Sequence, residues 1–167
     1  TREILENWRA KVSEGKEEKP KLIVYCVSGG GLKAAVWAMQ VMQRADSLTQ
    51  GKLMEHTALI TGASGGMIGA SYLREIYLKR AQGEPVNVYD RKYIDNISKD
   101  LLNSITFTIV SNDLFLPWTT FETGGGVYKK DRGYIFEKQL NENTDGAFSK
   151  KIGDYKTVEK NADIPML

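Results

Sequence analysis

Residues 21–31 read KLIVYCVSGGG, a compact run of apolar side chains that ends in one serine and three glycines. Such a β-branched and aromatic run, bounded by Pro20 and the glycines, predicts a buried strand. From Leu32 to about Leu48 the chain is rich in helix-forming residues, and the first half of that segment is apolar on nearly all sides. We expect a helix enclosed in a core, reached from the strand through a glycine turn. Cys26, the single cysteine, lies inside the run and is expected to be buried without chemistry.

The same order repeats further along. Residues 57–61 resemble a second strand, the glycine-rich stretch 62–66 follows, and a helical pattern then continues to about Arg80. Lys79 and Arg80 suit the C-terminus of that helix. The order of strand, turn, helix, strand, turn and helix predicts an α/β domain with a largely parallel sheet. Its ligand site should lie at the carboxyl ends of the strands, where both glycine turns fall.

The remaining segments are mainly helical in pattern. Residues 1–20 are expected to form an outer arm, with a short amphipathic helix and a charged loop from Ser13 to Pro20. Helices are predicted from about Arg91 and from about Asp131, and a strand begins at Ile164. We expect residues 21–167 to be the N-terminal part of one α/β domain that continues beyond Leu167. The apolar positions that predict the helices are Ile4, Leu5, Trp8 and Val12; Ile94, Ile97, Leu101 and Ile105; and Ile135, Phe136 and Leu140.

Composition narrows the function classes. The 167 residues carry 23 basic and 21 acidic side chains, a net charge of +2, and the charges are interspersed. This distribution disfavours nucleic acid as a partner. One histidine and one cysteine predict no metal site, and no cofactor is expected. No apolar stretch reaches the roughly 20 residues of a membrane-spanning helix, so a cytoplasmic or peripherally membrane-associated protein is expected, although a first residue other than Met leaves targeting open.

Ser64 is the predicted nucleophile. Gly62-Ala63-Ser64-Gly65-Gly66 is a full match to G-x-S-x-G between a predicted strand and a predicted helix. In that context the serine occupies a tight turn that projects its hydroxyl from the sheet, and the N–H of the following residue, Gly65, contributes to an oxyanion hole. The alternative is an ordinary glycine turn that contains a serine. The flanking elements favour the nucleophile.

Gly29, Gly30 and Gly31 form the second signal, again between a strand and a helix. Consecutive glycines can present a row of N–H groups at a helix N-terminus, where the helix dipole also attracts negative charge. An oxyanion formed during ester hydrolysis needs such a cradle. A phosphate or dinucleotide loop is the competing interpretation, but the G-x-G-x-x-G spacing and the G-K-[ST] ending are absent.

Together these motifs resemble the patatin-like family of lipid acyl hydrolases. The family joins a glycine-rich oxyanion turn and a basic residue to a G-x-S-x-G elbow, and here Gly29 to Lys33 and Gly62 to Gly66 match. Asp131-Arg132-Gly133-Tyr134 is similar to a stretch of bacterial members. The resemblance implies a three-layer sandwich with a mostly parallel central sheet, incomplete in this chain, a Ser–Asp dyad and an acyl-enzyme. It also implies phospholipid or other fatty-acyl ester substrates. If the substrate is a membrane lipid, the protein is expected to bind peripherally at a membrane surface. Lys33 stands where the family usually has Arg, which keeps an anion- or headgroup-binding charge but not its planar fork.

The base is less clear than the nucleophile. The family's catalytic Asp lies in Asp-Gly-Gly or Asp-Gly-Ala after further core strands, and Asp145-Gly146-Ala147 spells the second motif. Its polar, helix-ending setting disfavours Asp145, so we expect the base beyond Leu167. His56, the only histidine, is expected at the surface or at a helix cap.

Two further segments leave alternatives open. Residues 114–118, Leu-Phe-Leu-Pro-Trp, are expected to pack in the core, with insertion into lipid as the alternative. Gly124 to Gly126 are expected to form a mobile loop and not a second nest. Two other functions compete with a lipid hydrolase: an inactive lipid- or partner-binding module of the same fold, and an ordinary α/β-hydrolase. The latter needs a histidine after the nucleophile, and none follows Ser64.

Overall fold

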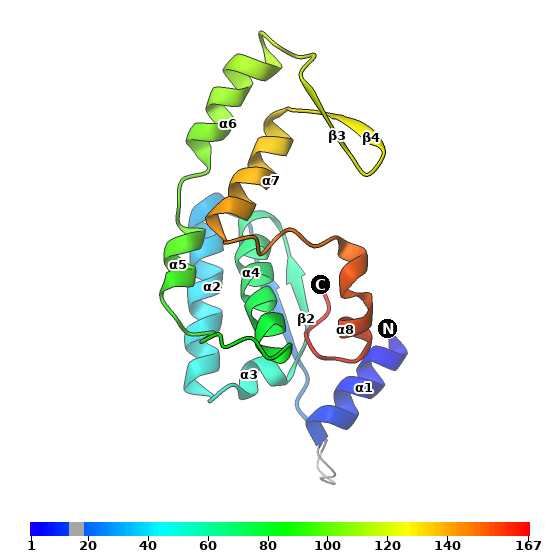
Figure 1. The fold of residues 1–167 in the computed structure, drawn as a ribbon. Helices are drawn as coiled ribbons and strands as arrows, with labels where there is room; N and C mark the ends of the chain where they lie inside the picture. Colours follow the sequence, from blue (N-terminus) through cyan, green and yellow to red (C-terminus); the bar gives the residue numbers. More distant parts are fainter. Residues whose placement is uncertain (14–18) are drawn as a thin grey trace. The chain divides into compact units, whose positions relative to one another are not determined.

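The computed structural model describes residues 1–13 and 19–167. Within this part, the chain forms two compact units (Figure 1). The first contains Thr1–Asp95 and Lys150–Leu167, and the second contains Asn96–Ser149. The predicted charged loop falls mostly on residues 14–18, outside the described residues. The predicted arm boundary at residue 20 and the continuation beyond Leu167 stay predictions.

The first unit holds both strand–turn–helix segments predicted from the sequence. Its helices pack beside a small parallel sheet, so the mixed α/β class is confirmed. Helix α5 (Lys92–Ile97) spans the boundary between the two units, which falls after Asp95. The elements are α1 (Arg2–Ser13), β1 (Ile23–Val27), α2 (Gly31–Leu48), α3 (Lys52–Glu55), β2 (Thr57–Gly62), α4 (Ser64–Ala81), the 3-10 helix η2 (Ile152–Tyr155) and α8 (Lys156–Lys160).

The sheet is parallel throughout the described residues. β1 pairs with β2 in parallel, with Tyr25 opposite Ile60 and Val27 opposite Gly62. On the other edge of β2, Met166 forms a parallel bridge with Leu59. The N–H of Met166 donates to the carbonyl of Ala58 at 3.0 Å, and its own carbonyl accepts from Ile60 at 2.9 Å. Of the strand predicted to begin at Ile164, only this single bridge at Met166 forms in the described residues, on the edge of β2 that does not pair with β1.

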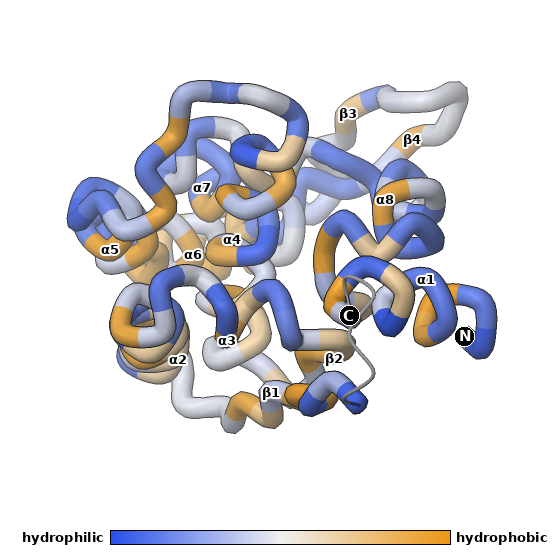
Figure 2. Tube along the Cα trace, turned by 90° about the horizontal axis from the view of Figure 1, so that it is seen from below, coloured by the Kyte–Doolittle hydropathy of each residue, from blue (hydrophilic) through white to orange (hydrophobic). Residues whose placement is uncertain are grey.

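Helices lie on both sides of these strands in the first unit. Seen along the sheet, α2 and α3 lie on one side of β1 and β2, and α1 lies on the other (Figure 2). The long helices α2 and α4 pack closely against each other, and their contact buries Met39, Met42 and Leu73. Trp8 and Val12 of α1 form an apolar cluster with Ala58 of β2. The predicted outer arm is thus a helix packed onto the sheet by one stripe.

Buried charged groups attach residues 150–165 to α4. The Arg74 guanidinium donates to the carbonyl of Pro165 at 2.7 Å and forms an ion pair with Glu159. Its neighbour Glu75 pairs with Lys150 and accepts from the Tyr155 hydroxyl at 2.8 Å. Burial lowers the pKa of Arg74, and the nearby Glu159 carboxylate opposes that change. Because both side chains are almost fully buried and both are paired, the segment is held in a specific place.

Two predictions about the first unit are wrong. Cys26 is exposed, because β1 is an edge strand whose residues alternate between partial burial and exposure. The first half of α2 is not enclosed on all sides either, since Trp37 is 69% exposed. The helix packs on α4 through its Ala35, Ala38 and Met39 stripe, so its opposite apolar face remains at the surface.

The second unit contains a helix pair and a hairpin. Helix α6 (Leu102–Thr108) continues into a π-helical turn, η1 (Ile109–Asp113), and α7 (Arg132–Asn143) packs on α6. Between them, β3 (Thr120–Thr123) and β4 (Gly126–Lys129) form an antiparallel hairpin. Phe121 of β3 packs on the Tyr134 ring of α7, with 4.3 Å between ring centroids. The Asp131 carboxylate caps α7 by accepting from the N–H groups of Gly133 and Tyr134.

Two predictions about this region are wrong. The single helix expected from Arg91 to Ile105 is two helices, α5 and α6, because the Asp100 carboxylate accepts from the N–H groups of Leu102 and Asn103 and starts a new one. Gly124 and Gly125 form the turn of the hairpin and Gly126 begins β4, while the mobility expected of this loop stays a prediction. Residues 114–118 do not pack in the core, since Trp118 is 71% exposed and its apolar neighbours are exposed as well. Across the described residues, no helix combines the length and apolar character needed to cross a membrane.

Candidate active site

Ser64 lies at the turn between β2 and α4 with a backbone conformation that serine seldom adopts. Its φ is 52°, in the left-handed region, while Ala63 before it is extended. A positive φ in a residue other than glycine costs on the order of 1 kcal/mol or more, and such strain gathers at functional sites. Here it reverses the chain between strand and helix and leaves Ser64 exposed at the end of the sheet. This is the conformation expected of a nucleophile elbow.

Glycines behind Ser64 let α4 approach the turn between β1 and α2. A Cβ at Gly65 would lie 1.9 Å from the carbonyl oxygen of Gly31, and one at Gly66 would lie 2.2 Å from that of Ser28. One turn later, a Cβ at Gly69 would lie 2.0 Å from the carbonyl oxygen of Ala35. No side chain fits at such distances. The three glycines therefore fix how closely the two glycine-rich turns meet.

This approach brings the predicted nest beside the predicted nucleophile. A Cβ built on Gly29 would lie 3.2 Å from the Ser64 Cβ and 3.8 Å from the Ser64 Oγ. Gly30 and Gly31 follow with φ of 137° and 62°, values that favour glycine. In the described part of the chain, no acceptor pairs with the N–H groups of Gly29, Gly30 or Gly31. These donors are exposed and available to a ligand next to Ser64.

The local electrostatics favour negative charge at this place. Two helices of 18 residues, α2 and α4, begin here, each with unpaired N–H groups in its first turn. Neither first turn contains an acidic residue. Lys33 adds a positive charge in the first turn of α2, where it is exposed. The arrangement can stabilise an oxyanion or a bound anionic group beside the Ser64 hydroxyl.

A base for Ser64 is not in place among the described residues. The Ser64 hydroxyl makes no hydrogen bond to any of them. His56 precedes β2, whereas Ser64 follows it, and a six-residue strand separates their backbones by about 20 Å. His56 caps α3 and its Nδ1 lies 3.1 Å from the carbonyl of Lys21. The predicted cap position of His56 is therefore confirmed.

Asp145 belongs to the second unit, while Ser64 and the nest belong to the first. It is exposed in the turn after α7, with a φ of 55°. Its Oδ2 accepts a hydrogen bond from the Asn96 amide at 2.8 Å. These contacts assign Asp145 a local place in the turn, and its role as a base stays an untested hypothesis.

A buried acid that no sequence pattern indicates lies further from this turn. Asp46 of α2 is 1% exposed and accepts from the backbone N–H of Met54 at 2.7 Å and from the hydroxyls of Tyr77 and Tyr89. Burial and the Asp46 hydrogen bond raise the pKa of Tyr77, so its phenol remains protonated. The cluster joins α2, α3, α4 and the loop at Tyr89. Its role is structural.

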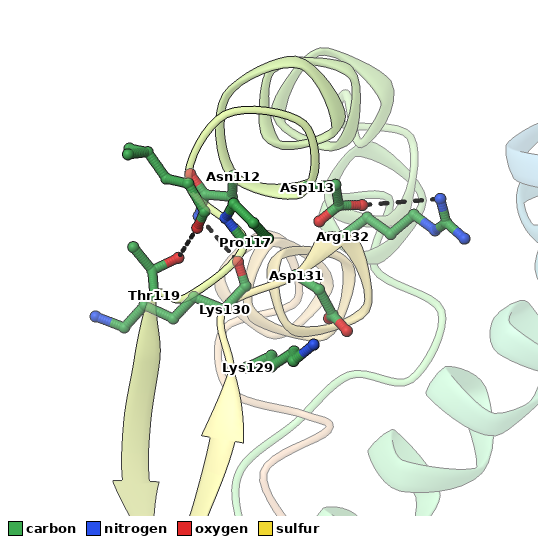
Figure 3. A pocket seen from close by; sticks show the side chains of 9 residues that line it. Asn112, Asp113, Pro117, Thr119, Lys129, Lys130, Asp131 and Arg132 are labelled. Atoms are coloured by element: carbon green, nitrogen blue, oxygen red, sulfur yellow. Dashed lines mark hydrogen bonds and ion pairs between the residues drawn. The ribbon is translucent and has the colours of Figure 1, made fainter.

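The second unit contains a pocket that the sequence motifs did not predict. A pocket of about 240 Å³ lies between η1, the turn after it and the end of β4 (Figure 3). Its polar lining comes from Asn112, Asp113, Thr119, Lys129, Lys130, Asp131 and Arg132. The Lys129-Lys130 doublet is the sequence feature that could have indicated this pocket. In the described residues, no group of three or more His, Cys, Asp or Glu side chains forms a metal site.

No family model matches this chain, and neither the curated proteins nor the solved structures contain a significant match.

Proposed function

We propose that this chain carries the nucleophile and the oxyanion hole of a serine-dependent acyl hydrolase that acts on phospholipids or other fatty-acyl esters. The observation that carries the proposal is Ser64, strained at a φ of 52° and so close to Gly29 that a Cβ built there would lie 3.2 Å from the Ser64 Cβ. The two motifs resemble those of patatin-like enzymes. On that resemblance, we also propose that the parallel strands belong to a three-layer patatin-like sandwich.

In the proposed reaction, the Ser64 Oγ attacks the ester carbonyl carbon and its proton passes to a base. The carbonyl oxygen becomes negatively charged, and N–H groups of Gly29, Gly30, Gly31 and Gly65 donate to it. Loss of one such donor typically raises the barrier by about 2.7–4 kcal/mol. The tetrahedral intermediate then expels the alcohol, which takes up a proton, and water hydrolyses the acyl-enzyme.

The resemblance assigns the base to an aspartate, and the second role of the site to Lys33. An exposed ammonium in the first turn of α2 is suited to hold a phosphate headgroup near the nest. The reaction needs neither a metal nor an organic cofactor in this scheme. Asp145 is a weak candidate for the base because of its turn setting.

A catalytically inactive lipid- or partner-binding module is the second candidate. The observation that favours it is the Ser64 hydroxyl, which has no hydrogen-bonded base among the described residues. An unassisted serine hydroxyl is a weak nucleophile and would acylate slowly. Such a module would bind fatty acids or liposomes without turnover.

Labelling with a fluorophosphonate probe tests the first proposal. The probe should add one phosphonyl group to the peptide that contains Ser64, detected by mass spectrometry, and Ser64→Ala should not be labelled. Ser71→Ala, a serine within α4, serves as the matched control and should label like the unmodified protein. A folded sample that binds lipid but is never labelled at Ser64 would replace the hydrolase with the binding module.

A further inference from the structure

The segment from Phe107 to Trp118 in the second unit exposes an unusual concentration of large apolar side chains. Single exposed apolar residues are normal, but a run of them marks an interaction surface. The run spans the end of α6, the π-helical turn η1 and the turn that follows it. The exposed residues are Phe107, Ile109, Val110, Leu114, Phe115, Leu116 and Trp118.

Several backbone N–H groups of this segment donate to carbonyls of its own turns. The N–H of Leu114 donates to Ile109, that of Phe115 donates to Ser111, and that of Thr119 donates to Leu116 at 3.2 Å. Pro117 has no N–H to satisfy. These bonds reduce the number of backbone donors that contact with a bilayer would leave unpaired.

The charges beside the segment are unbalanced toward positive. Asp113 is paired with Arg132 at 3.7 Å, and the Asp131 carboxylate is used in capping α7. Lys129 and Lys130 make no ion pair within the described residues, and both line the pocket that also contains Leu116 (Figure 3). Lysines at the edge of an apolar surface attract the phosphates of anionic lipids, and Trp prefers the interface between the two.

We infer that residues 107–118, together with Lys129 and Lys130, form a docking surface for an anionic lipid bilayer. This docking surface rests on the proposed function only for its purpose, which is to bring a lipid substrate to the protein. A second copy of the chain fits less well, because a two-fold contact through this surface would place four unpaired lysines near one another. Binding to vesicles should therefore depend on both the apolar turn and the lysines.

Co-sedimentation of the protein with lipid vesicles measures how strongly each variant binds the bilayer. With vesicles of phosphatidylcholine and phosphatidylglycerol, Trp118→Ser should lower the partition coefficient at least tenfold, because a large apolar side chain leaves the interface. Trp37→Ser is the matched control: it removes a tryptophan of similar exposure, 69% against 71%, from α2 in the other unit, and should change nothing. Lys129→Gln with Lys130→Gln should weaken binding on the order of tenfold, and only to anionic vesicles at low salt.

Fluorescence gives a second measurement. In Trp37→Phe, the remaining tryptophans are the buried Trp8 and the exposed Trp118, and brominated lipids should quench the latter. In Trp118→Phe, the exposed Trp37 should not be quenched. Equal loss of binding in Trp37→Ser and Trp118→Ser would overturn the docking surface. So would a self-association, measured by light scattering, that Trp118→Ser abolishes in a protein that does not bind vesicles.

The two proposals fail separately. Ser64→Ala should bind vesicles like the unmodified protein, and Trp118→Ser should still be labelled at Ser64 by a soluble fluorophosphonate. Vesicle binding without labelling removes the hydrolase and keeps the docking surface. Labelling with equal vesicle binding in all variants keeps the hydrolase and removes the docking surface.

Discussion

At the scale of single residues, Ser64 combines a chemical and a conformational signal. The sequence motif predicts the elbow, and the φ of 52° shows the strain that the motif implies. Its side chain is exposed, so the cost of the conformation is not repaid by packing of the hydroxyl. Close glycine contacts at Gly65 and Gly66 hold the turn instead. Residues kept in strained conformations by their surroundings are typical of reactive sites.

This strain predicts an inversion of the usual effect of glycine. The Ser64→Gly protein should be more stable than the Ser64→Ala protein by about 1 kcal/mol, because only glycine adopts a positive φ without a penalty. Gln40 is an exposed position within α2. There the order should reverse: the Gln40→Gly protein should be less stable than the Gln40→Ala protein by about 1 kcal/mol, because glycine weakens helices. Chemical denaturation of the four variants gives the free energies of unfolding. The same sign at both positions would mean that Ser64 is not strained.

Other single residues could not be placed from the sequence. Cys26 and Trp37 lie in apolar segments, which predicts burial, yet both are exposed. An apolar pattern identifies a strand or helix that packs on something, but it does not say which face finds a neighbour. The buried face is decided by the pairing of β1 with β2 on one edge only and by the packing of α2 on α4. Both contacts join segments far apart in the sequence.

At the scale of elements, local signals explain both successes and failures. The two strand–turn–helix segments follow from long runs and glycine punctuation. The break before α6 needed the Asp100 cap to outweigh an apolar stripe that continues across it. The β3–β4 hairpin had a signal, since Thr120–Thr123 and Gly126–Lys129 flank a two-residue Gly-Gly turn that favours hairpins. The flanking strands are only four residues long, so their alternating pattern is weak, and the three glycines alone suggested a loop.

The bridge between Met166 and β2 gives a prediction at this scale. Met166→Pro removes the N–H that donates to the buried Ala58 at 3.0 Å, which leaves that carbonyl unpaired. The free energy of unfolding should fall by about 1–3 kcal/mol. Leu167→Pro is the matched control, because the Leu167 N–H makes no backbone hydrogen bond within the described residues. Similar losses in both variants would show that the bridge contributes little.

At the scale of the molecule, the first unit is held together by acids that bind phenols. Asp46 accepts from Tyr77 and Tyr89, and Glu75 accepts from Tyr155. Burial first, and then the hydrogen bond to the carboxylate, raises the pKa of Tyr77 and of Tyr155 well above the ordinary value of about 10. Each contact links segments far apart in the sequence. Neither partner of such a pair is marked by a motif, so the sequence does not predict them.

The raised pKa values predict how the whole first unit responds to alkali. Unfolded tyrosines lose their protons above about pH 10, while Tyr77 in the folded protein keeps its proton, so the folded state binds more protons and stability falls as pH rises past 10. Tyr77→Phe should lower stability at neutral pH, since Asp46 loses a donor, but should flatten the alkaline decline by about 1.4 kcal/mol per pH unit. Denaturation between pH 8 and 11 measures both effects, with Tyr128→Phe, an exposed phenol of the hairpin, as the control. An unchanged slope in Tyr77→Phe would mean that the Asp46 contact does not hold the phenol protonated.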